Sequence, residues 1–511
     1  MQVGRRAPGR NTNDVLRGGM QDRSRRSGAH RAGWALAVAL LCAGAASAAE
    51  WRDRVTFTLS DRARGEFVDW FRPPDGVASE GAERYGFFGN QLRAGVHVVL
   101  SHVQLTLEGQ DTRLANLPDD ATLPPPHGAI GPGALYFLNT RDSSQGETFL
   151  KQGFLTLRRR GFTATLGRFE YREGLETMPG DPTLAFLKRA RIAERLVGTF
   201  DFTHVTRSFD GVRLTYDEPG WNATAMGVRP TRGGFEVSAN RELDDVSLAG
   251  LALTAKRLPF SGAPPADLRL FYLFFDDSRD EPLKVDNRAP GVRELDRDSI
   301  AVHTIGGHAV TAVDVGPGVL DGLVWAVGQF GEWGELDHAA WAYALELGYQ
   351  LPRVPAQPWL RIGVNQSSGD DDPTDGDHGT FFQVLPTARV YAQLPFFNLM
   401  NNQDVFAQLV LRPHARVTIR ADYHWLSLTE RRDLWYAGGG ATNARIFGFS
   451  GAPAGGHREL AHLVDLSVNA KLHDHVSLGV YYGHAFGRAV VRTSFAGTDA
   501  DYGFVELTFR Y

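Results

Sequence analysis

Apolar and polar residues alternate with a period of two in short segments along almost the whole chain after residue 54. Residues 103–108, 360–365 and 417–425 show the pattern plainly. Successive side chains of a β-strand point to opposite faces, so each segment has one apolar and one polar face. After residue 50, the sequence has no stretch that approaches the roughly 20 unbroken apolar residues of a membrane helix. The pattern therefore predicts an all-β protein built from many strands.

The segments with this alternation predict about 18 strands, with 16 as the alternative, because an even number lets the first and last strands meet antiparallel. The expected strands are residues 53–67, 90–100, 102–110, 149–158, 161–169, 206–217, 220–229, 246–256, 267–276, 299–313, 321–331, 339–350, 358–366, 403–412, 415–427, 461–472, 475–485 and 501–511.

The connections between these segments favour a membrane barrel over a soluble sandwich. Short turns at residues 159–161, 218–220 and 473–474 alternate with long loops, of which 111–147 and 428–460 are examples. Short turns on one side and long loops on the other are typical of outer-membrane barrels, whose polar face lines a wet interior. The last segment alternates up to the aromatic residue Tyr511, as such barrels do. We therefore expect a single transmembrane antiparallel β-barrel with long extracellular loops and short periplasmic turns.

The first 48 residues have the pattern of a secretory signal peptide. An Arg-rich stretch precedes an apolar run from Trp34 to Ala46, and Ala46 and Ala48 are small residues at the recognition positions for cleavage. The stretch before the apolar run is long, which suggests that translation starts at Met20. We expect residues 49–511 to form one barrel domain in the lipid bilayer of a Gram-negative-type outer membrane.

The charge pattern limits the classes of partner that the chain is expected to bind. The chain has 54 Lys and Arg against 59 Asp and Glu, and it has no basic stripe, which argues against a nucleic-acid partner. Most of the basic residues are Arg, whose guanidinium fork binds carboxylates bidentately. Strand alternation places Arg93, Arg213, Arg361 and Arg420 on the polar faces, where they would line the lumen.

A second charged segment, residues 369–381, is rich in aspartate. Clustered carboxylates bind hard cations, so Asp370, Asp372, Asp375 and Asp377 are candidate ligands for Ca²⁺. Their spacing does not match the twelve-residue calcium loop, and a solvated loop is the alternative. No other metal or cofactor is expected.

Several stretches resemble the alginate export family of outer-membrane barrels. They are residues 166–176, 191–200, 207–213, 368–381, 423–426 and 433–440. The resemblance implies a monomeric 18-stranded barrel with an Arg-rich constriction that lets an anionic uronate polysaccharide leave the periplasm. It adds Arg168, Arg191, Arg195 and Arg207 to the candidate pore charges. Glu194, Asp210 and Asp422 are the expected counter-charges.

The resulting hypothesis is an anion-selective channel, not an enzyme, for acidic polysaccharide or smaller organic anions, with periplasmic export proteins as further candidate partners. Two alternatives remain open at this point. One is a structural or surface-binding barrel whose loops seal the lumen. The other is a barrel-embedded hydrolase that uses His424 and Asp422, although the sequence has no nucleophile elbow.

Overall fold

A computed structural model of the chain describes residues 54–257, 262, 264–280, 283–387, 393–437, 442–444 and 446–511. The predicted signal peptide, residues 1–48, and the predicted start at Met20 lie outside these residues. Residues Phe57–Tyr511 form one compact unit, and the barrel described below is this unit.

The predicted 18-strand antiparallel barrel is confirmed in the described part of the chain. Its strands are β1 (Val55–Asp69), β2 (Arg84–Val99), β3 (Val103–Ala115), β4 (Gln145–Arg159), β5 (Phe162–Phe169), β6 (Phe209–Asp217), β7 (Trp221–Pro230), β8 (Val246–Ala255), β9 (Ala266–Asp277), β10 (Ile300–Val315), β11 (Gly318–Trp333), β12 (Leu336–Gln350), β13 (Trp359–Ser367), β15 (Gln403–His414), β16 (Val417–Ser427), β19 (Glu459–Lys471), β20 (Val476–Gly487) and β21 (Asp499–Arg510).

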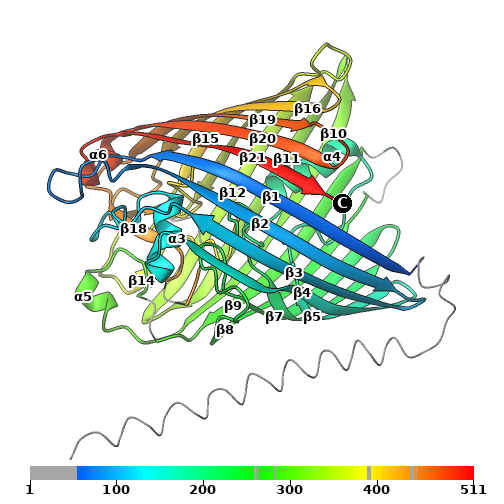
Figure 1. Ribbon diagram of the computed structural model, residues 1–511, viewed down its shortest axis with the longest axis horizontal. Helices are drawn as coiled ribbons and strands as arrows, with labels where there is room; N and C mark the ends of the chain where they lie inside the picture. Colours follow the sequence, from blue (N-terminus) through cyan, green and yellow to red (C-terminus); the bar gives the residue numbers. More distant parts are fainter. Residues whose placement is uncertain are drawn as a thin grey trace, which may run out of the picture. The chain divides into compact units, whose positions relative to one another are not determined.

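The barrel closes where the first strand meets the last. Strand β1 pairs antiparallel with β21 in a continuous register from Ser60↔Arg510 to Asp69↔Asp501. Figure 1 shows the blue β1 beside the red β21. Closure leaves no free strand edge in the wall, which lipid would not tolerate because it offers no hydrogen bonds to backbone N–H and C=O groups.

The alternation that predicted the strands becomes an outer face and an inner face. Strand β12 is the clearest case, because buried and less buried side chains alternate along its whole length. Leu345 and Leu347 are about half exposed on the outer face, whereas Glu346 between them is buried inside. Lipid takes the place of water around the outer apolar side chains, and the lumen receives the polar ones.

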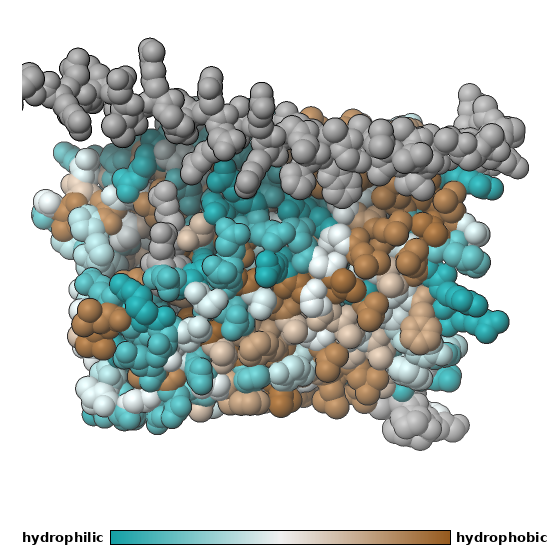
Figure 2. Space-filling model, turned by 90° about the horizontal axis from the view of Figure 1, so that it is seen from below, coloured by the Kyte–Doolittle hydropathy of each residue, from teal (hydrophilic) through white to brown (hydrophobic). Residues whose placement is uncertain are grey.

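Aromatic side chains border the apolar part of the outer wall. The rings of Trp341 and Tyr343 stack towards one end of β12, with their centroids 5.7 Å apart. At the other end of the barrel, next to short turns, the ring centroids of Phe162 and Tyr216 lie 4.4 Å apart. Figure 2 shows brown apolar side chains gathered on one side of the molecule, with teal hydrophilic ones towards both ends. Aromatic girdles of this kind mark the two membrane interfaces.

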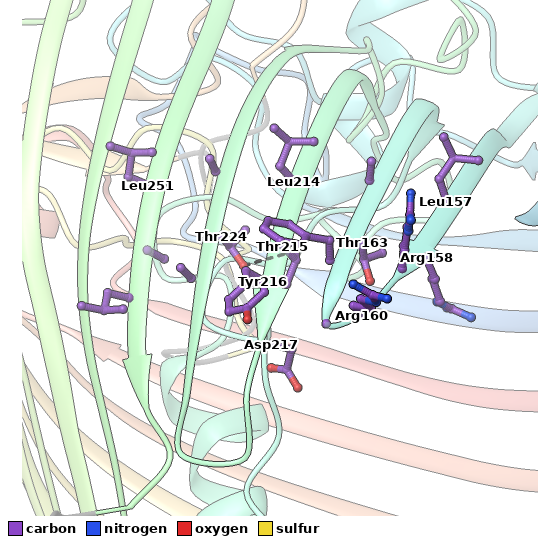
Figure 3. A pocket seen from close by; sticks show the side chains of 18 of the residues that line it. Leu157, Arg158, Arg160, Thr163, Leu214, Thr215, Tyr216, Asp217, Thr224 and Leu251 are labelled. Carbon is purple, nitrogen blue, oxygen red and sulfur yellow. Dashed lines mark hydrogen bonds between the residues drawn. The ribbon is translucent and has the colours of Figure 1, made fainter. Parts of the chain in front are cut away.

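A shallow hollow on the outer wall is also apolar. It lies over β4 to β9, with Leu157, Leu214 and Leu251 among its lining residues and Arg158 and Arg160 at its rim (Figure 3). Its leucine side chains belong to the lipid-facing set, so it is not a site for a polar substrate. In the described residues, no helix is long and apolar enough to cross a membrane.

The connections are divided between the two ends of the barrel, largely as predicted. Residues 160–161, 218–220, 316–317 and 415–416 are short turns at one end, and the long loops lie at the other, with the two-residue turn 334–335 as an exception. The loops carry α3 (Pro132–Thr140), α4 (Pro182–Leu187), the single π-helical turn η1 (Lys188–Ile192), α5 (Pro290–Arg293), α6 (Ala489–Ser494) and the short strands β14 (Asp377–His378), β17 (Leu434–Ala437) and β18 (Ser450–Pro453). In Figure 1, α3, α5 and α6 lie at the left, whereas α4 lies far to the right.

The outer face makes a direct prediction. Leu345 lies midway between the outward residues Trp341 and Tyr349 on β12, at mid-depth of the apolar wall. The substitution Leu345→Arg should lower the free energy of unfolding by about 2–4 kcal/mol, because it buries a charge in lipid. The measurement is urea unfolding of the barrel in lipid vesicles, followed by tryptophan fluorescence. Ala339→Arg, on the same face nearer the strand end, should cost about 0–1 kcal/mol; equal losses for both variants would contradict the assignment of the lipid face.

Candidate functional site

The long connection between β5 and β6, residues 170–208, folds into the barrel and is called the inward loop below. On one side of the lumen, Arg62 of β1 donates to the Asp201 carbonyl at 3.0 Å. Gln91 of β2 and Gln110 of β3 donate to the His204 carbonyl at 2.7 and 3.0 Å. Wall side chains thus satisfy backbone groups that a loop buried in the lumen would otherwise leave unpaired.

A second loop, described over residues 368–387 and 393–402, packs against the inward loop and is called the companion loop. Leu385 of this loop accepts from the Gly198 N–H at 2.9 Å and donates its own N–H to the Leu196 carbonyl at 2.8 Å. The Thr387 N–H donates to the Glu194 carbonyl at 3.0 Å. The two loops together form a strand-like junction inside the barrel, and their apolar residues Leu196 and Leu385 are fully buried there.

The inward loop is fixed to the opposite wall by an arginine cluster around one carboxylate. Arg191 donates to both oxygens of Glu346 on β12 at 2.9–3.0 Å, and Arg195 donates to Glu346 Oε1 at 3.1 Å. Arg361 of β13 donates to Glu346 Oε2 at 2.8 Å and also pairs with Asp321 of β11. All five side chains are almost completely buried.

This cluster changes the role of three predicted pore charges. The structure brings Arg191, Arg195 and Arg361 together, but their guanidinium groups are bonded to carboxylates and shielded from the aqueous space. Breaking such a buried pair leaves an uncompensated charge, so the cluster anchors the loop. Sequence reasoning missed Glu346, although its position between Leu345 and Leu347 would have revealed an inward carboxylate.

Two further ion pairs anchor the loop to β9. Lys188 in η1 donates to both oxygens of Asp267 at 2.8–2.9 Å, and His308 of β10 contacts the same carboxylate at 2.7 Å. Arg269 pairs with Glu173 and donates to Glu176 at 2.8 Å. The inward loop is therefore held from both sides of the lumen.

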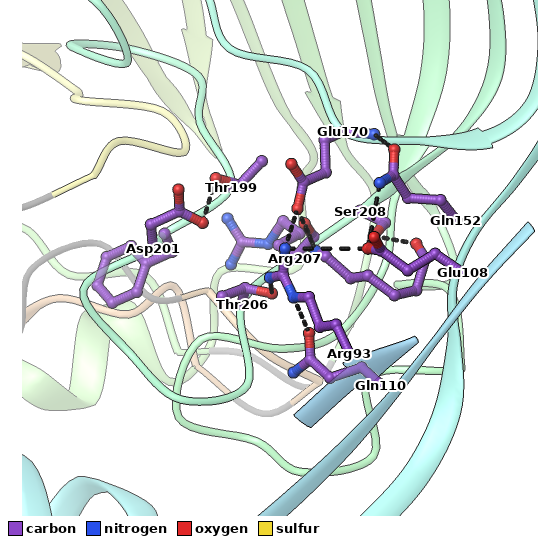
Figure 4. A network of polar contacts seen from close by, with 12 residues as sticks. Arg93, Glu108, Gln110, Gln152, Glu170, Thr199, Asp201, Thr206, Arg207 and Ser208 are labelled. Carbon is purple, nitrogen blue, oxygen red and sulfur yellow. Dashed lines mark hydrogen bonds and ion pairs between the residues drawn. The ribbon is translucent and has the colours of Figure 1, made fainter. Parts of the chain in front are cut away.

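A polar network lies where the loop leaves the wall (Figure 4). Arg93 of β2 donates to Glu170 at 3.0 Å, and Lys151 of β4 lies 3.3 Å from the same carboxylate. Arg93 is partly exposed and faces the lumen as predicted from alternation. Arg207, by contrast, is completely buried, and its Nη2 donates to the Thr442 carbonyl at 2.7 Å. Arg207 thus belongs to loop packing and does not face the channel.

The carboxylate of Glu194, an expected counter-charge, is held by hydrogen bonds within the inward loop. Its carboxylate accepts from the backbone N–H and the hydroxyl of Thr199 at 2.9 and 3.0 Å. Burial, together with the neighbouring Asp201, raises the pKa of Glu194 to about 7, against the effect of the Arg172 guanidinium. Burial would also raise the pKa of Asp201, but its ion pair with Arg172 holds that pKa well below its usual range.

A polar chamber of about 480 Å³ lies between the inward loop and the wall strands β15, β16 and β19. Its lining includes the guanidinium-bearing residues Arg172, Arg189, Arg412 and Arg420, and the acids Glu194 and Asp201. The wall residues Thr418 and Asn469 lie near short turns, so the chamber is at the short-turn end of the lumen. Among these arginines, only Arg420 was predicted.

Two of the chamber arginines have no acidic partner in the described part of the chain. Neither Arg189 nor Arg412 forms an ion pair with another described residue, and Arg412 lies over the Phe186 ring at 5.8 Å. Arg420 contacts its predicted counter-charge Asp422 at 2.6 Å. Arg213 faces the lumen too, over the Phe169 ring at 5.4 Å.

The expectation that Arg168 and Asp210 line the lumen is wrong. They pair at 2.5 Å across β5 and β6, but they alternate in phase with the exposed Leu166 and Val212 and therefore lie on the outer face. The prediction for Arg168 followed the family-like segment, whereas its strand parity indicates the opposite face.

The acidic segment of the companion loop is held by local turns. Asp370 accepts from the Asp372 N–H at 3.0 Å, Asp372 from the Thr374 N–H at 3.0 Å, and Asp375 from the Asp377 N–H at 3.0 Å. In the described ranges, three metal-ligating side chains have ligand atoms within 4.8 Å of one another, and they belong to β16 and β19. The candidate calcium ligands of the acidic segment are not among them.

Fold and lumen together define a porin-like outer-membrane β-barrel. The sequence matches the model of the family described as alginate export over residues 53–500, and the chain belongs to that family. The protein is accordingly located in a Gram-negative outer membrane. No curated protein sequence matches the chain.

Solved structures share the fold at low sequence identity. OpdK from Pseudomonas aeruginosa is 10% identical, with 89% of this chain and 99% of that chain covered and a TM-score of 0.52. A BenF-like porin from Pseudomonas fluorescens Pf-5 is 8% identical, with 89% and 98% covered and a TM-score of 0.56. OccK2 (OpdF) from Pseudomonas aeruginosa, in complex with glucuronate, is 10% identical, with 90% and 98% covered and a TM-score of 0.53. At these identities the likeness concerns the fold alone.

The raised pKa of Glu194 predicts a pH effect on the inward loop. The folded chain keeps this proton up to about pH 7, whereas the unfolded chain loses it near 4.5, so the stabilisation is complete below pH 4.5 and disappears as the pH rises through 7. Glu194→Gln, which mimics the protonated acid, should reduce the fall in unfolding free energy between pH 5 and pH 8 by about 1–3 kcal/mol.

Urea unfolding in lipid vesicles at both pH values measures this difference. Glu335→Gln, in the exposed turn between β11 and β12, is the matched control and should keep the pH dependence of the natural protein. If Glu194→Gln kept it as well, Glu194 would not be the titrating group.

Proposed function

We propose that this barrel is a channel that passes organic anions bearing carboxylates, alginate-like uronates among them, through a lumen whose chamber attracts them with arginine. The observation that carries the proposal is the pair of unpaired guanidinium groups, Arg189 and Arg412, on the chamber of about 480 Å³. This volume lies within the range of about 300–1,000 Å³ typical of small-molecule sites.

The two kinds of arginine in the lumen support a division of roles. Arg191, Arg195 and Arg361 hold the inward loop through Glu346, and their charge is already compensated. Arg189 and Arg412 have no such partner among the residues that the structure describes, so their field reaches the aqueous chamber. Transport needs sites that attract the ion and also release it, and cations in water-filled space meet both needs better than buried ones.

The family and one solved relative support the choice of anion. The family is described as alginate export, and alginate is a polymer of uronates, each with one carboxylate. OccK2, which shares the fold, was crystallised with glucuronate, a monomeric uronate. The inward loop is anchored to both walls of the lumen, and this obstruction favours single uronates or short oligomers. Passage of a polymer, outward flow, a periplasmic export partner and a monomeric state remain predictions.

A sealed structural barrel is the second candidate, because loops anchored from both walls can close a lumen. A hydrolase receives less support. His424 is bonded to Asp404 at 2.9 Å and not to Asp422, and its Nε2 has no hydroxyl partner among the residues that the structure describes.

The first experiment measures the reversal potential of the purified protein in planar bilayers across a KCl gradient, with and without glucuronate and guluronate oligomers. An anion-selective current that uronates block would support the channel. A silent bilayer, with the folded barrel verified by its faster mobility on unheated gels, would favour the sealed barrel.

The chamber arginines then make a specific prediction. Arg189→Gln or Arg412→Gln should each lower the anion-to-cation permeability ratio about four- to sixteenfold. One charge at about 10 Å from the ion, at an effective dielectric constant between about 40 and 80, changes the attraction of anions and the repulsion of cations by about two- to fourfold each. Arg353→Gln, in the exposed turn between β12 and β13, is the control and should leave the ratio unchanged. If all three variants kept the permeability ratio of the natural protein, the chamber would not lie on the permeation path.

A further inference from the structure

Three side chains on adjacent strands of the lumen wall bring metal-ligating atoms together. Asp422 and His424 are inward residues of β16, and Asp465 of β19 lies directly opposite Asp422 in the strand register. One ligating atom from each lies within 4.8 Å of the other two. All three side chains are buried, with 4%, 1% and 1% of their surfaces exposed.

The imidazole of His424 is oriented by a second layer of residues. Its Nδ1 lies 2.9 Å from Asp404 Oδ1, and Asn365 donates to the other oxygen of Asp404 at 3.1 Å. The ring is therefore fixed, and its Nε2 has no hydrogen-bond partner among the described residues. A carboxylate on one ring nitrogen and an open second nitrogen is the arrangement that orients histidine ligands in metal sites.

The carboxylates of the cluster also have open positions. Oδ1 of Asp422 and Oδ1 of Asp465 lack a hydrogen-bond partner in the described structure, whereas Oδ2 of Asp422 is in ion-pair contact with Arg420. Arg420 lies 2.6 Å from Asp422 and 3.9 Å from Asp465, and Tyr481 donates to Asp465 at 3.4 Å. Arg191 lies nearby, but its guanidinium is bonded to Glu346.

The carboxylates of this group outnumber its cationic side chains, even with His424 protonated beside Asp404. Asp404, Asp422 and Asp465 are three buried carboxylates, and Arg420 is the guanidinium ion-paired with two of them. Buried charges without compensation are expensive, and an acidic wall beside the chamber would oppose the entry of anions. A bound divalent cation would remove both problems.

We propose that Asp422, His424 and Asp465 form a binding site for a divalent transition-metal ion of the zinc class. One imidazole and two carboxylates suit Zn²⁺, whose coordination shell would be completed by water. Ca²⁺ prefers six to eight oxygen ligands, so the imidazole disfavours it. The rings of Phe406 and Phe397, centred 5.8 and 6.5 Å from that of His424, form an apolar surround that limits access of water.

The site does not depend on the proposed transport function, so its test uses metal binding alone. The mature chain without a histidine tag is purified in detergent, freed of metal with EDTA, and titrated with ZnCl₂ by calorimetry, with the bound zinc counted by mass spectrometry. We expect one Zn²⁺ per chain at the site. Asp422→Asn and Asp465→Asn should each weaken binding by about tenfold or more, and Asp404→Asn, which alters the orientation of His424, by about 10- to 100-fold.

An exposed turn supplies the matched control. His473 and His475, whose rings lie 5.7 Å apart, are the obvious alternative ligands for zinc at the surface. The double variant His473→Ala/His475→Ala should bind zinc as the natural chain does. Loss of binding in this variant with retention in Asp422→Asn would overturn the proposal, as would a folded natural chain that binds no zinc. Mobility on unheated gels verifies folding of every variant.

Discussion

The structure depends on one constraint, which is that lipid offers no hydrogen bonds to the backbone. Every N–H and C=O group of a strand in the wall must pair with a neighbouring strand, and a sheet achieves this only when its first and last strands meet. The pairing of β1 with β21 from Ser60↔Arg510 onwards meets the requirement. Closure then forces each strand to turn one face to lipid and one to the lumen, and the remaining features of the protein follow from this division.

A barrel this wide would be open unless loops obstruct it, and the inward loop shows how a polar interior is filled. Its backbone is bonded to the wall through Arg62, Gln91 and Gln110, and its side chains reach Glu346 on the far side. A loop in an apolar core would leave such groups unpaired. The lumen can hold it because strand alternation supplies polar side chains at regular intervals along the inner wall.

The fold was predictable because its signal is repeated. A misread segment among 18 would not have altered the overall period, and the strand limits differ from the expected ones mainly in the extension of strands such as β3 to Ala115 and β4 from Gln145. The site was less predictable. Parity identified Arg361 and Arg420 as inward residues, but it carries no information about which residue on another strand or loop each one meets. The meeting of Arg191, Arg195 and Arg361 at Glu346 depends on how the inward loop folds, and no local pattern encodes that.

Arg168 illustrates the same limit from the other side. Its segment resembles the family, yet its strand parity, in phase with Leu166, places it on the outer face beside Asp210. For residues in strands, the physical rule of alternation was therefore a better guide to position than the resemblance. For residues in loops, neither rule sufficed: Arg189 and Arg195 are six positions apart in the same loop, and one lines the chamber while the other is buried against Glu346. The difference between an attracting charge and an anchoring charge arises from the carboxylate that each one meets, and this is a property of the folded lumen.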